Sequence, residues 1–278
     1  MSVTDVRSVT GERLDALASG DQPRAALVGY LPVGFPTVEG SIAAVRTMID
    51  AGVDVVELGM PYTAPVMDGP VIQAAAARAL ANGTRVRDTL RVIEEVAGTG
   101  VPVLVMTYWN LVLRYGVDAY ARDLAAAGGA GLITPDLIPD EAGDWLAASD
   151  AHGLDRVFLV APSSTPERTA ATVAASRGFV YAASTMGVTG ERATVGDRAE
   201  RLVADTRAAG ATRVCVGLGV SRPDQAAEVA GYADGVIVGT ALVRSLLEAP
   251  DEASGLTALA RVTAGLAEGV RSAQRAPR

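Results

Sequence analysis

Short apolar runs alternate with longer amphipathic stretches along nearly the whole chain. Each run spans four to seven residues, is rich in β-branched side chains and lacks a polar face, which is typical of strands buried on both sides. We predict eight such strands, at residues 26–31, 53–59, 102–107, 131–134, 156–161, 179–183, 213–217 and 235–238.

The amphipathic stretches predict helices between these strands and at both ends of the chain. Their ranges are 5–18, 38–51, 70–81, 86–96, 117–127, 140–151, 166–176, 197–209, 223–230, 241–247 and 253–272. Eight evenly spaced strand–helix units favour a (β/α)8 TIM barrel over an open doubly wound sheet. No linker or low-complexity tract divides the chain, so we expect a single (β/α)8 barrel domain over residues 1–278, with the extra N- and C-terminal helices capping the barrel.

Composition narrows the possible chemistry. All 24 basic residues are arginine, so a lysine Schiff base is excluded. The single histidine, His152, and the single cysteine, Cys215, are too few for a zinc site built from His and Cys ligands. We therefore expect no metal site of this kind, and chemistry based on carboxylates, phenols, hydroxyls, arginine and backbone N–H groups.

The net charge and the pattern of apolar residues also bear on the possible binding partners and on the cellular location. The formal net charge of −8 and the lack of a basic stripe argue against nucleic-acid binding. The first 20 residues have no apolar core segment and no apolar run approaches the length of a membrane span. A lone cysteine fits a reducing compartment, so we expect a cytoplasmic protein that does not enter a membrane.

Two carboxylates fall where a barrel would place its active site. Glu57 lies inside an apolar strand near its carboxyl end, and Asp68 follows in the next loop. A buried carboxylate with a raised pKa suits general acid–base catalysis. A structural glutamate and a turn or helix-capping aspartate are the alternative interpretations, and the residues alone leave both open.

Glycine-rich loops predict a phosphate site. The seventh predicted strand leads into Gly217 and Gly219, and the eighth leads into Gly239 and Thr240 before a helix. Loops after strands seven and eight of a barrel often bind phosphate with backbone N–H groups. The long loop 185–196 contains three glycines and is a candidate lid.

Several motifs together resemble the α subunit of tryptophan synthase. They read Glu-Leu-Gly-Met-Pro-Tyr from Glu57, Asp-Gly-Pro from Asp68, Met-Thr-Tyr-Trp-Asn from Met106, Met-Gly-Val-Thr-Gly from Met186, and Gly-Leu-Gly-Val-Ser from Gly217, followed by Val-Gly-Thr-Ala. They follow the family's order and spacing over nearly the whole chain. The resemblance implies a (β/α)8 barrel that cleaves indole-3-glycerol phosphate to indole and glyceraldehyde 3-phosphate without metal or cofactor.

The resemblance also implies residue roles. Glu57 and Asp68 match the family's catalytic carboxylates, and Tyr181 matches a tyrosine beside the glutamate. The substrate-binding positions that match are Tyr30, Tyr108 and Leu218 for the indole pocket, Thr189 for the lid, and Gly190, Gly219, Gly239 and Thr240 for the phosphate site. The implied partner is a tryptophan synthase β subunit, in an assembly of two α and two β subunits.

Departures from the family pattern leave alternatives open. Thr63-Ala64-Pro65 stands where Ser-Asp-Pro is common, and the missing aspartate is associated with the β subunit. Ala64 therefore keeps open a stand-alone lyase that releases free indole for another pathway. Two further alternatives are a β-activating subunit with weak catalysis and a phosphate-binding barrel with other chemistry.

Overall fold

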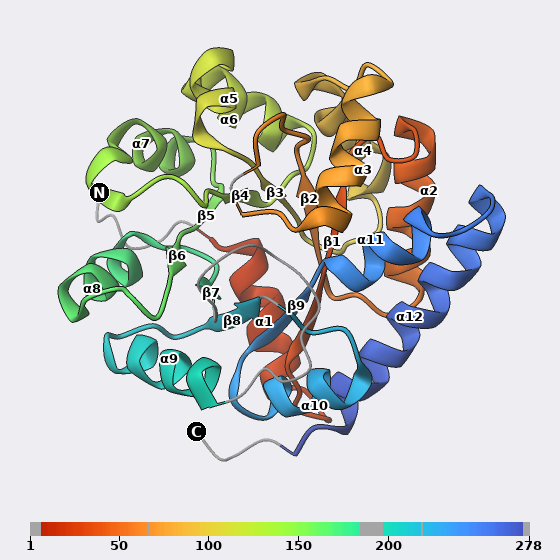
Figure 1. The fold of residues 1–278 in the computed structure, drawn as a ribbon. Helices are drawn as coiled ribbons and strands as arrows, with labels where there is room; N and C mark the ends of the chain where they lie inside the picture. The colour runs from red at the N-terminus through yellow and green to blue at the C-terminus, as the bar shows by residue number, and fades with distance from the viewer. Residues whose placement is uncertain (1–6, 66, 184–196, 218, 275–278) are drawn as a thin grey trace.

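Nine parallel strands form one sheet in the computed structural model, which describes residues 7–65, 67–183, 197–217 and 219–274. The sheet runs in the order β5-β4-β3-β2-β1-β9-β8-β7-β6, with the helices arranged around it (Figure 1). The strands are β1 (Ala26–Pro32), β2 (Val55–Gly59), β3 (Val103–Met106), β4 (Gly131–Ile133), β5 (Asp155–Val157), β6 (Leu159–Val160), β7 (Val180–Ala183), β8 (Val214–Gly217) and β9 (Gly235–Val238). The predicted (β/α)8 barrel is confirmed.

The fifth predicted strand, 156–161, consists of two short strands. Asp155–Val157 pairs with β4, whereas Leu159–Val160 pairs with β7. The buried Phe158 lies between them, and its carbonyl accepts a hydrogen bond from the Tyr181 N–H. The chain therefore changes its pairing partner at Phe158, which gives nine strands where the apolar pattern predicts eight.

Helices cover the outside of the barrel as the amphipathic pattern predicts. They are α2 (Val38–Asp50), α3 (Pro70–Ala81), α4 (Val86–Ala97), α6 (Val117–Ala126), α7 (Gly143–Ala151), α8 (Pro166–Ala175), α9 (Asp197–Ala208), α10 (Pro223–Tyr232), α11 (Thr240–Leu247) and α12 (Glu252–Ser272). The long helix α12 packs against α2, α10 and α11 in the outer ring (Figure 1). The expectation that α12 caps an end of the barrel is therefore wrong.

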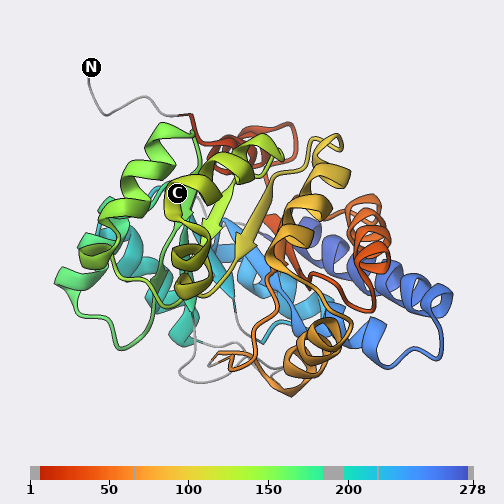
Figure 2. The ribbon, with the colours of Figure 1, turned by 90° about the horizontal axis from the view of Figure 1, so that it is seen from above.

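Helix α1 (Val9–Ser19) covers the amino ends of the strands. Its Leu14 packs with side chains from inside the barrel, and Figure 2 shows α1 in dark red at one end of the barrel. The helix begins at Val9 because the Ser8 hydroxyl caps it, accepting a hydrogen bond from the Gly11 N–H at 2.9 Å. The predicted start at residue 5 lies outside the described residues.

Two local details differ from the predicted helices. Helix α5 (Trp109–Tyr115) has no predicted counterpart, because its first N–H is bound by the distant Asp136 carboxylate at 2.9 Å rather than by a local cap. The predicted helix 140–151 is a 3-10 turn, η1 (Pro139–Glu141), followed by α7. The backbone leaves the helical conformation at Ala142, where φ is −90° and ψ is 11°.

The strands are buried on both faces. One cluster of side chains fills the barrel and includes Val28, Val55, Ile133 and Cys215, while a larger one packs the strands against the helices. Among the helices that the structure describes, none is long and apolar enough to cross a membrane.

Candidate active site

Glu57 lies in β2, buried among apolar residues and 1% exposed. Its register partners on the neighbouring strands are Tyr30 of β1 and Leu104 of β3. Its Oε2 has no hydrogen-bond partner among the described residues. Burial, together with the nearby Asp68 carboxylate, raises the pKa of Glu57 to about 8. Glu57 is therefore protonated at neutral pH and can donate a proton.

Asp68 lies in the loop between β2 and α3. The N-cap of α3 is Gly69, which has no side chain to cap the helix, and Pro70 follows at the first helical position. The capping interpretation of Asp68 is therefore not supported. Burial raises the pKa of Asp68 to about 6, so its carboxylate is mainly ionised at pH 7 while Glu57 keeps its proton.

Two tyrosines flank the carboxylates. Tyr30 and Tyr181 are 8% and 6% exposed, and burial followed by the nearby carboxylates raises the pKa of both well above the usual value. Their hydroxyl groups lie over Gly59 and Gly217, where an added Cβ would be only 2.1 Å and 2.0 Å from the hydroxyl oxygens. Glycine at the ends of β2 and β8 thus provides the room that these neutral phenols need.

Glycine backbone and a helix N-terminus form another wall of the site. Gly219 follows β8 with a φ of 100°, which favours glycine. Gly239 is the N-cap of α11, and Thr240, 8% exposed, is its first residue. Free N–H groups at the start of a helix and the positive end of its dipole bind anions. This arrangement suits a phosphate group.

One cavity of about 470 Å³, its open mouth included, brings these groups together. Seven of the predicted site residues line it: Tyr30, Glu57, Asp68, Tyr181, Gly219, Gly239 and Thr240. Thr189, Gly190 and Leu218 lie outside the described residues. Tyr108 is not among the lining residues; its hydroxyl instead accepts a hydrogen bond from the Met67 N–H at 3.2 Å.

Four lining residues have no counterpart in the sequence-based prediction: Ile72, Met106, Val220 and Ile237. Met106 and Ile237 lie near the carboxyl ends of β3 and β9, and Val220 directly follows Gly219. Ile72 lies in the first turn of α3. For Met106 and Ile237 the signal that could have found them is their position at strand ends, because apolar residues there face the active site of a barrel. They give the cavity an apolar surface suited to an aromatic ring.

The described residues contain no group of histidine, cysteine or carboxylate side chains that could hold a metal ion. His152, for which no catalytic role is predicted, is the C-cap of α7 and contacts Asp118, with Nε2 and Oδ1 2.9 Å apart. The titratable side chains that line the cavity are those of Glu57, Asp68, Tyr30 and Tyr181.

Fold and site together define a class of protein. The protein is a (β/α)8-barrel enzyme whose cavity combines two carboxylates of raised pKa, apolar side chains and glycine-rich loops after β8 and β9 that suit an anion.

Comparisons with known proteins identify the family. The family described as "Tryptophan synthase alpha chain" matches residues 17–271. A tryptophan synthase alpha chain from Salinispora arenicola is 65% identical over 249 residues, covering 90% of this chain and 93% of the relative. A structure of Mycobacterium tuberculosis tryptophan synthase superposes with a TM-score of 0.88 at 58% identity, covering 94% of this chain and 98% of that one. The alpha subunit from Legionella pneumophila has a TM-score of 0.84 at 29% identity, with 95% and 98% covered.

The chain belongs to the tryptophan synthase alpha chain family. The resemblance found in the sequence is thereby confirmed, and with it the class of enzyme, a carbon–carbon lyase of tryptophan biosynthesis. The relatives do not favour a stand-alone lyase, a weakly catalytic activating subunit or a barrel with other chemistry.

Proposed function

We propose that this chain cleaves indole-3-glycerol phosphate to indole and glyceraldehyde 3-phosphate as the α subunit of tryptophan synthase. The observation that carries the proposal is the pair Glu57 and Asp68. They share one cavity with an anion site, yet the pKa is about 8 for Glu57 and about 6 for Asp68. Near pH 7 the cavity therefore offers one proton donor and one anion, which retro-aldol cleavage of this substrate requires.

Asp68 and Glu57 have different roles in the proposed reaction. The ionised Asp68 accepts a hydrogen bond from the indole N–H and stabilises the positive charge that develops when the ring carbon is protonated. Glu57 supplies that proton to the ring carbon bearing the glycerol chain. It then takes the proton of the hydroxyl on the adjacent chain carbon. The carbon–carbon bond breaks, its electron pair returns to the indole ring, an aldehyde forms, and Glu57 is protonated again.

The remaining groups hold the substrate. The N–H groups at Gly219, Gly239 and Thr240 bind the phosphate, with the Thr240 hydroxyl as a further donor. Tyr30, Met106 and Ile237 contact the indole ring, and Tyr181 lies beside the carboxylates. Thr189, Gly190 and Leu218 complete the proposed substrate-binding set; Tyr108, predicted to line the indole pocket, is not among the residues that line the cavity.

A β subunit is the proposed partner, in an assembly of two α and two β subunits. Three large apolar side chains, Leu113 and Tyr115 of α5 and Ile138 before η1, are 53%, 37% and 41% exposed. The bond between Asp136 and the Trp109 N–H ties these two segments together. This apolar surface supports docking of another protein. We also propose that the chain acts as one domain in the cytoplasm, where its free Cys215 stays reduced.

Indole release tests the proposal. The purified chain is assayed with indole-3-glycerol phosphate alone and again after a β subunit is added. Slow release that the β subunit accelerates is expected of a synthase α subunit. Release that is already fast and insensitive to the β subunit would identify a stand-alone lyase, with Ala64→Asp as the first reversion to make. No release under either condition would refute the activity.

A further inference from the structure

The loop between β2 and α3 carries Asp68 but reaches away from the barrel before it returns. Thr63 and Ala64 are exposed, whereas Asp68 lies in the cavity. A loop of this length has many conformations, and holding a catalytic group in one of them needs specific contacts. The contacts around Asp68 therefore decide how well the site is ordered.

A single side chain, Tyr108, contacts the loop at two points. The ring of Tyr62 stacks on the ring of Tyr108, with centroids 4.6 Å apart and planes 30° apart. The hydroxyl of Tyr108 accepts a hydrogen bond from the N–H of Met67, the residue before Asp68, at 3.2 Å. The outgoing and returning parts of the loop are thus fixed to the same tyrosine.

Tyr108 is itself held by the barrel. It lies two residues after the end of β3 and is the N-cap of α5. The next N–H, that of Trp109, is bound by both oxygens of the Asp136 carboxylate at 2.9 Å and 3.1 Å. The Thr107 hydroxyl donates to the Tyr108 carbonyl at 3.2 Å. The anchor is therefore rigid relative to the strands.

The backbone of Asp68 is fixed from its other side by α3. The side-chain amide of Gln73 donates to the Asp68 carbonyl at 2.7 Å, and the Gln73 N–H donates to the Gly69 carbonyl at 2.9 Å. Asp68 thus lies between a contact to Tyr108 on one side and a contact to Gln73 on the other. Two contacts join the loop to Tyr108. The hydrogen bond from the Met67 N–H holds the returning part of the loop, and the stacking of Tyr62 holds the outgoing part.

We propose that Tyr62 is a positioning residue for Asp68, acting through its stacking on Tyr108. Tyr62 is not among the residues that line the cavity; it holds the loop in place so that the Asp68 carboxylate faces the indole N–H. This inference rests on the proposed function, since it assigns Asp68 the role described above. It also changes the predicted role of Tyr108 from lining the indole pocket to anchoring the loop.

Loss of the Tyr62 ring has two expected consequences. A displacement of about 1 Å at a catalytic group can lower turnover up to about a hundredfold, and Tyr62→Ala is expected to lower kcat about tenfold. KM should stay within about twofold, because the phosphate group binds elsewhere. Without the Tyr62 ring, water should reach the Asp68 carboxylate. The pKa of Asp68 should then fall, and the acid limb of the plot of kcat against pH should move to lower pH.

The kinetic test compares Tyr62→Ala with two other variants. Tyr62→Phe keeps the ring that stacks on Tyr108. Tyr108→Phe keeps the Tyr108 ring but loses the oxygen that accepts the hydrogen bond from the Met67 N–H. Tyr62→Phe should retain at least about half of the kcat, and Tyr108→Phe should fall between the wild type and Tyr62→Ala. Tyr232→Ala is the matched control, because it truncates another half-buried tyrosine, on α10, and should leave kcat and the acid limb unchanged.

An unchanged kcat in Tyr62→Ala would overturn the proposal, as would an unmoved acid limb or an equal loss in Tyr62→Phe. Amide hydrogen exchange separates this proposal from the proposed function, because it needs no substrate. The Met67 N–H should exchange at least about tenfold faster in Tyr62→Ala than in the wild type, even if the wild type released no indole. Equal protection in the two chains would show that Tyr62 does not hold the loop, and Tyr62→Leu repeats the comparison if Tyr62→Ala does not fold.

Discussion

The two ends of the barrel use carboxylates in opposite ways. At the amino ends of the strands, Asp54 is 2% exposed and accepts hydrogen bonds from Arg24 at 2.6 Å and 2.7 Å, from Arg13 at 3.0 Å and from the Leu27 N–H at 3.0 Å. At the carboxyl ends, Glu57 and Asp68 have no ion pair among the described residues. Arginine side chains hold the Asp54 carboxylate at one end, whereas burial destabilises the anions of Glu57 and Asp68 at the other.

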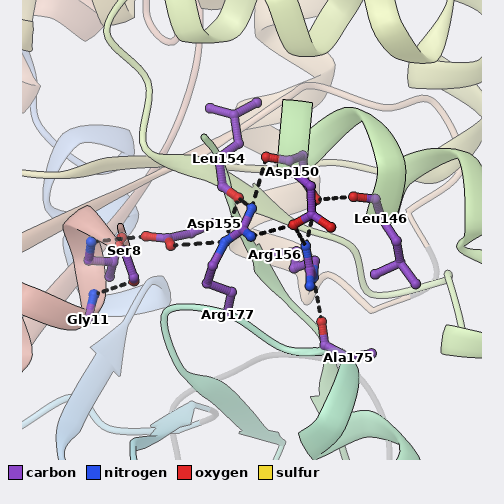
Figure 3. A network of polar contacts seen from close by, with 11 residues as sticks. Ser8, Gly11, Leu146, Asp150, Leu154, Asp155, Arg156, Ala175 and Arg177 are labelled. Atoms are coloured by element: carbon purple, nitrogen blue, oxygen red, sulfur yellow. Dashed lines mark hydrogen bonds and ion pairs between the residues drawn. The ribbon is translucent and has the colours of Figure 1, made fainter. Parts of the chain in front are cut away.

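Figure 3 shows a second cluster at the amino ends, around β5. Asp150 Oδ1 accepts bonds from Arg156 and Arg177, each at 2.5 Å, and these bonds lower the pKa of Asp150 against the effect of its burial. Asp155 accepts the Thr10 N–H of α1 at 2.9 Å. Arg156 also donates to the Ala175 carbonyl at the end of α8. These bonds join α1, α7 and α8 at the point where β5 and β6 separate.

A hollow also exists at this end, and the arginines that line it are already paired with carboxylates. It measures about 820 Å³ with its mouth included and is lined by Arg177 and Arg213. Both guanidinium groups already bind carboxylates, those of Asp150 and Asp15. Charged groups that are already paired have little capacity to bind or protonate a substrate. The smaller cavity, which contains Glu57 without an ion pair to any described residue, is therefore the better candidate for an active site.

The largest expected effect follows from removing the proton donor. Glu57→Gln keeps the shape of the side chain but cannot transfer a proton, so kcat for indole release should fall about a thousandfold. KM should change little, because the phosphate site is untouched. A loss of binding as large as the loss of turnover, measured by isothermal titration with a substrate analogue, would contradict the role of Glu57.

The same variant should be more stable than the wild type at alkaline pH. The pKa of Glu57 is 4.5 in an unperturbed state and about 8 in the folded chain, so the folded chain holds a proton that the unfolded chain loses between these values. The free energy of unfolding of the wild type therefore falls as pH rises from about 4.5 to about 8. Glu57→Gln lacks this term, so its Tm should exceed that of the wild type at pH 8 and match it near pH 4.5.

At the amino ends of the strands, replacing a carboxylate by its amide should lower stability and leave catalysis unchanged. Asp54→Asn leaves Arg24 without its buried partner, and breaking such a pair costs about 3 kcal/mol. Denaturant unfolding should show this loss, while kcat and KM stay within about twofold of the wild type. An unchanged free energy of unfolding in Asp54→Asn would show that the paired carboxylate at the amino ends does not stabilise the fold.

Asp68→Asn tests the anion of the acid–base pair. The amide cannot stabilise positive charge on the indole ring, so kcat should fall at least about a hundredfold. Because Asp68 raises the pKa of Glu57, the basic limb of the remaining activity should also move to lower pH. A basic limb that stays in place in steady-state kinetics would argue against coupling of the two carboxylates.

The smallest expected effect concerns the phosphate site. Thr240→Ala removes one hydroxyl donor at the start of α11, and a hydrogen bond to a charged group contributes about 1.5 kcal/mol. KM should therefore rise about tenfold with kcat nearly constant. A fall in kcat with unchanged KM would show that Thr240 does not bind the phosphate.

The sequence predicts what depends on local pattern and misses what depends on distant contacts. Apolar runs predicted the strands, and the strand end at Glu57 predicted a carboxylate in the cavity. Helix α5 was missed because Asp136, which binds its first N–H, lies 27 residues away. The contact between Thr10 and Asp155 spans 145 residues, so nothing near α1 in the sequence shows where it docks.

The central claim is that Glu57 acts as an acid while Asp68 acts as an anion in the same cavity. The most direct test is kcat/KM for indole release from indole-3-glycerol phosphate between pH 5 and pH 9. The account predicts a bell-shaped profile with limbs near pH 6 and pH 8, because the pKa is about 6 for Asp68 and about 8 for Glu57. A profile that is flat across this range, or activity that keeps rising above pH 8, would contradict it.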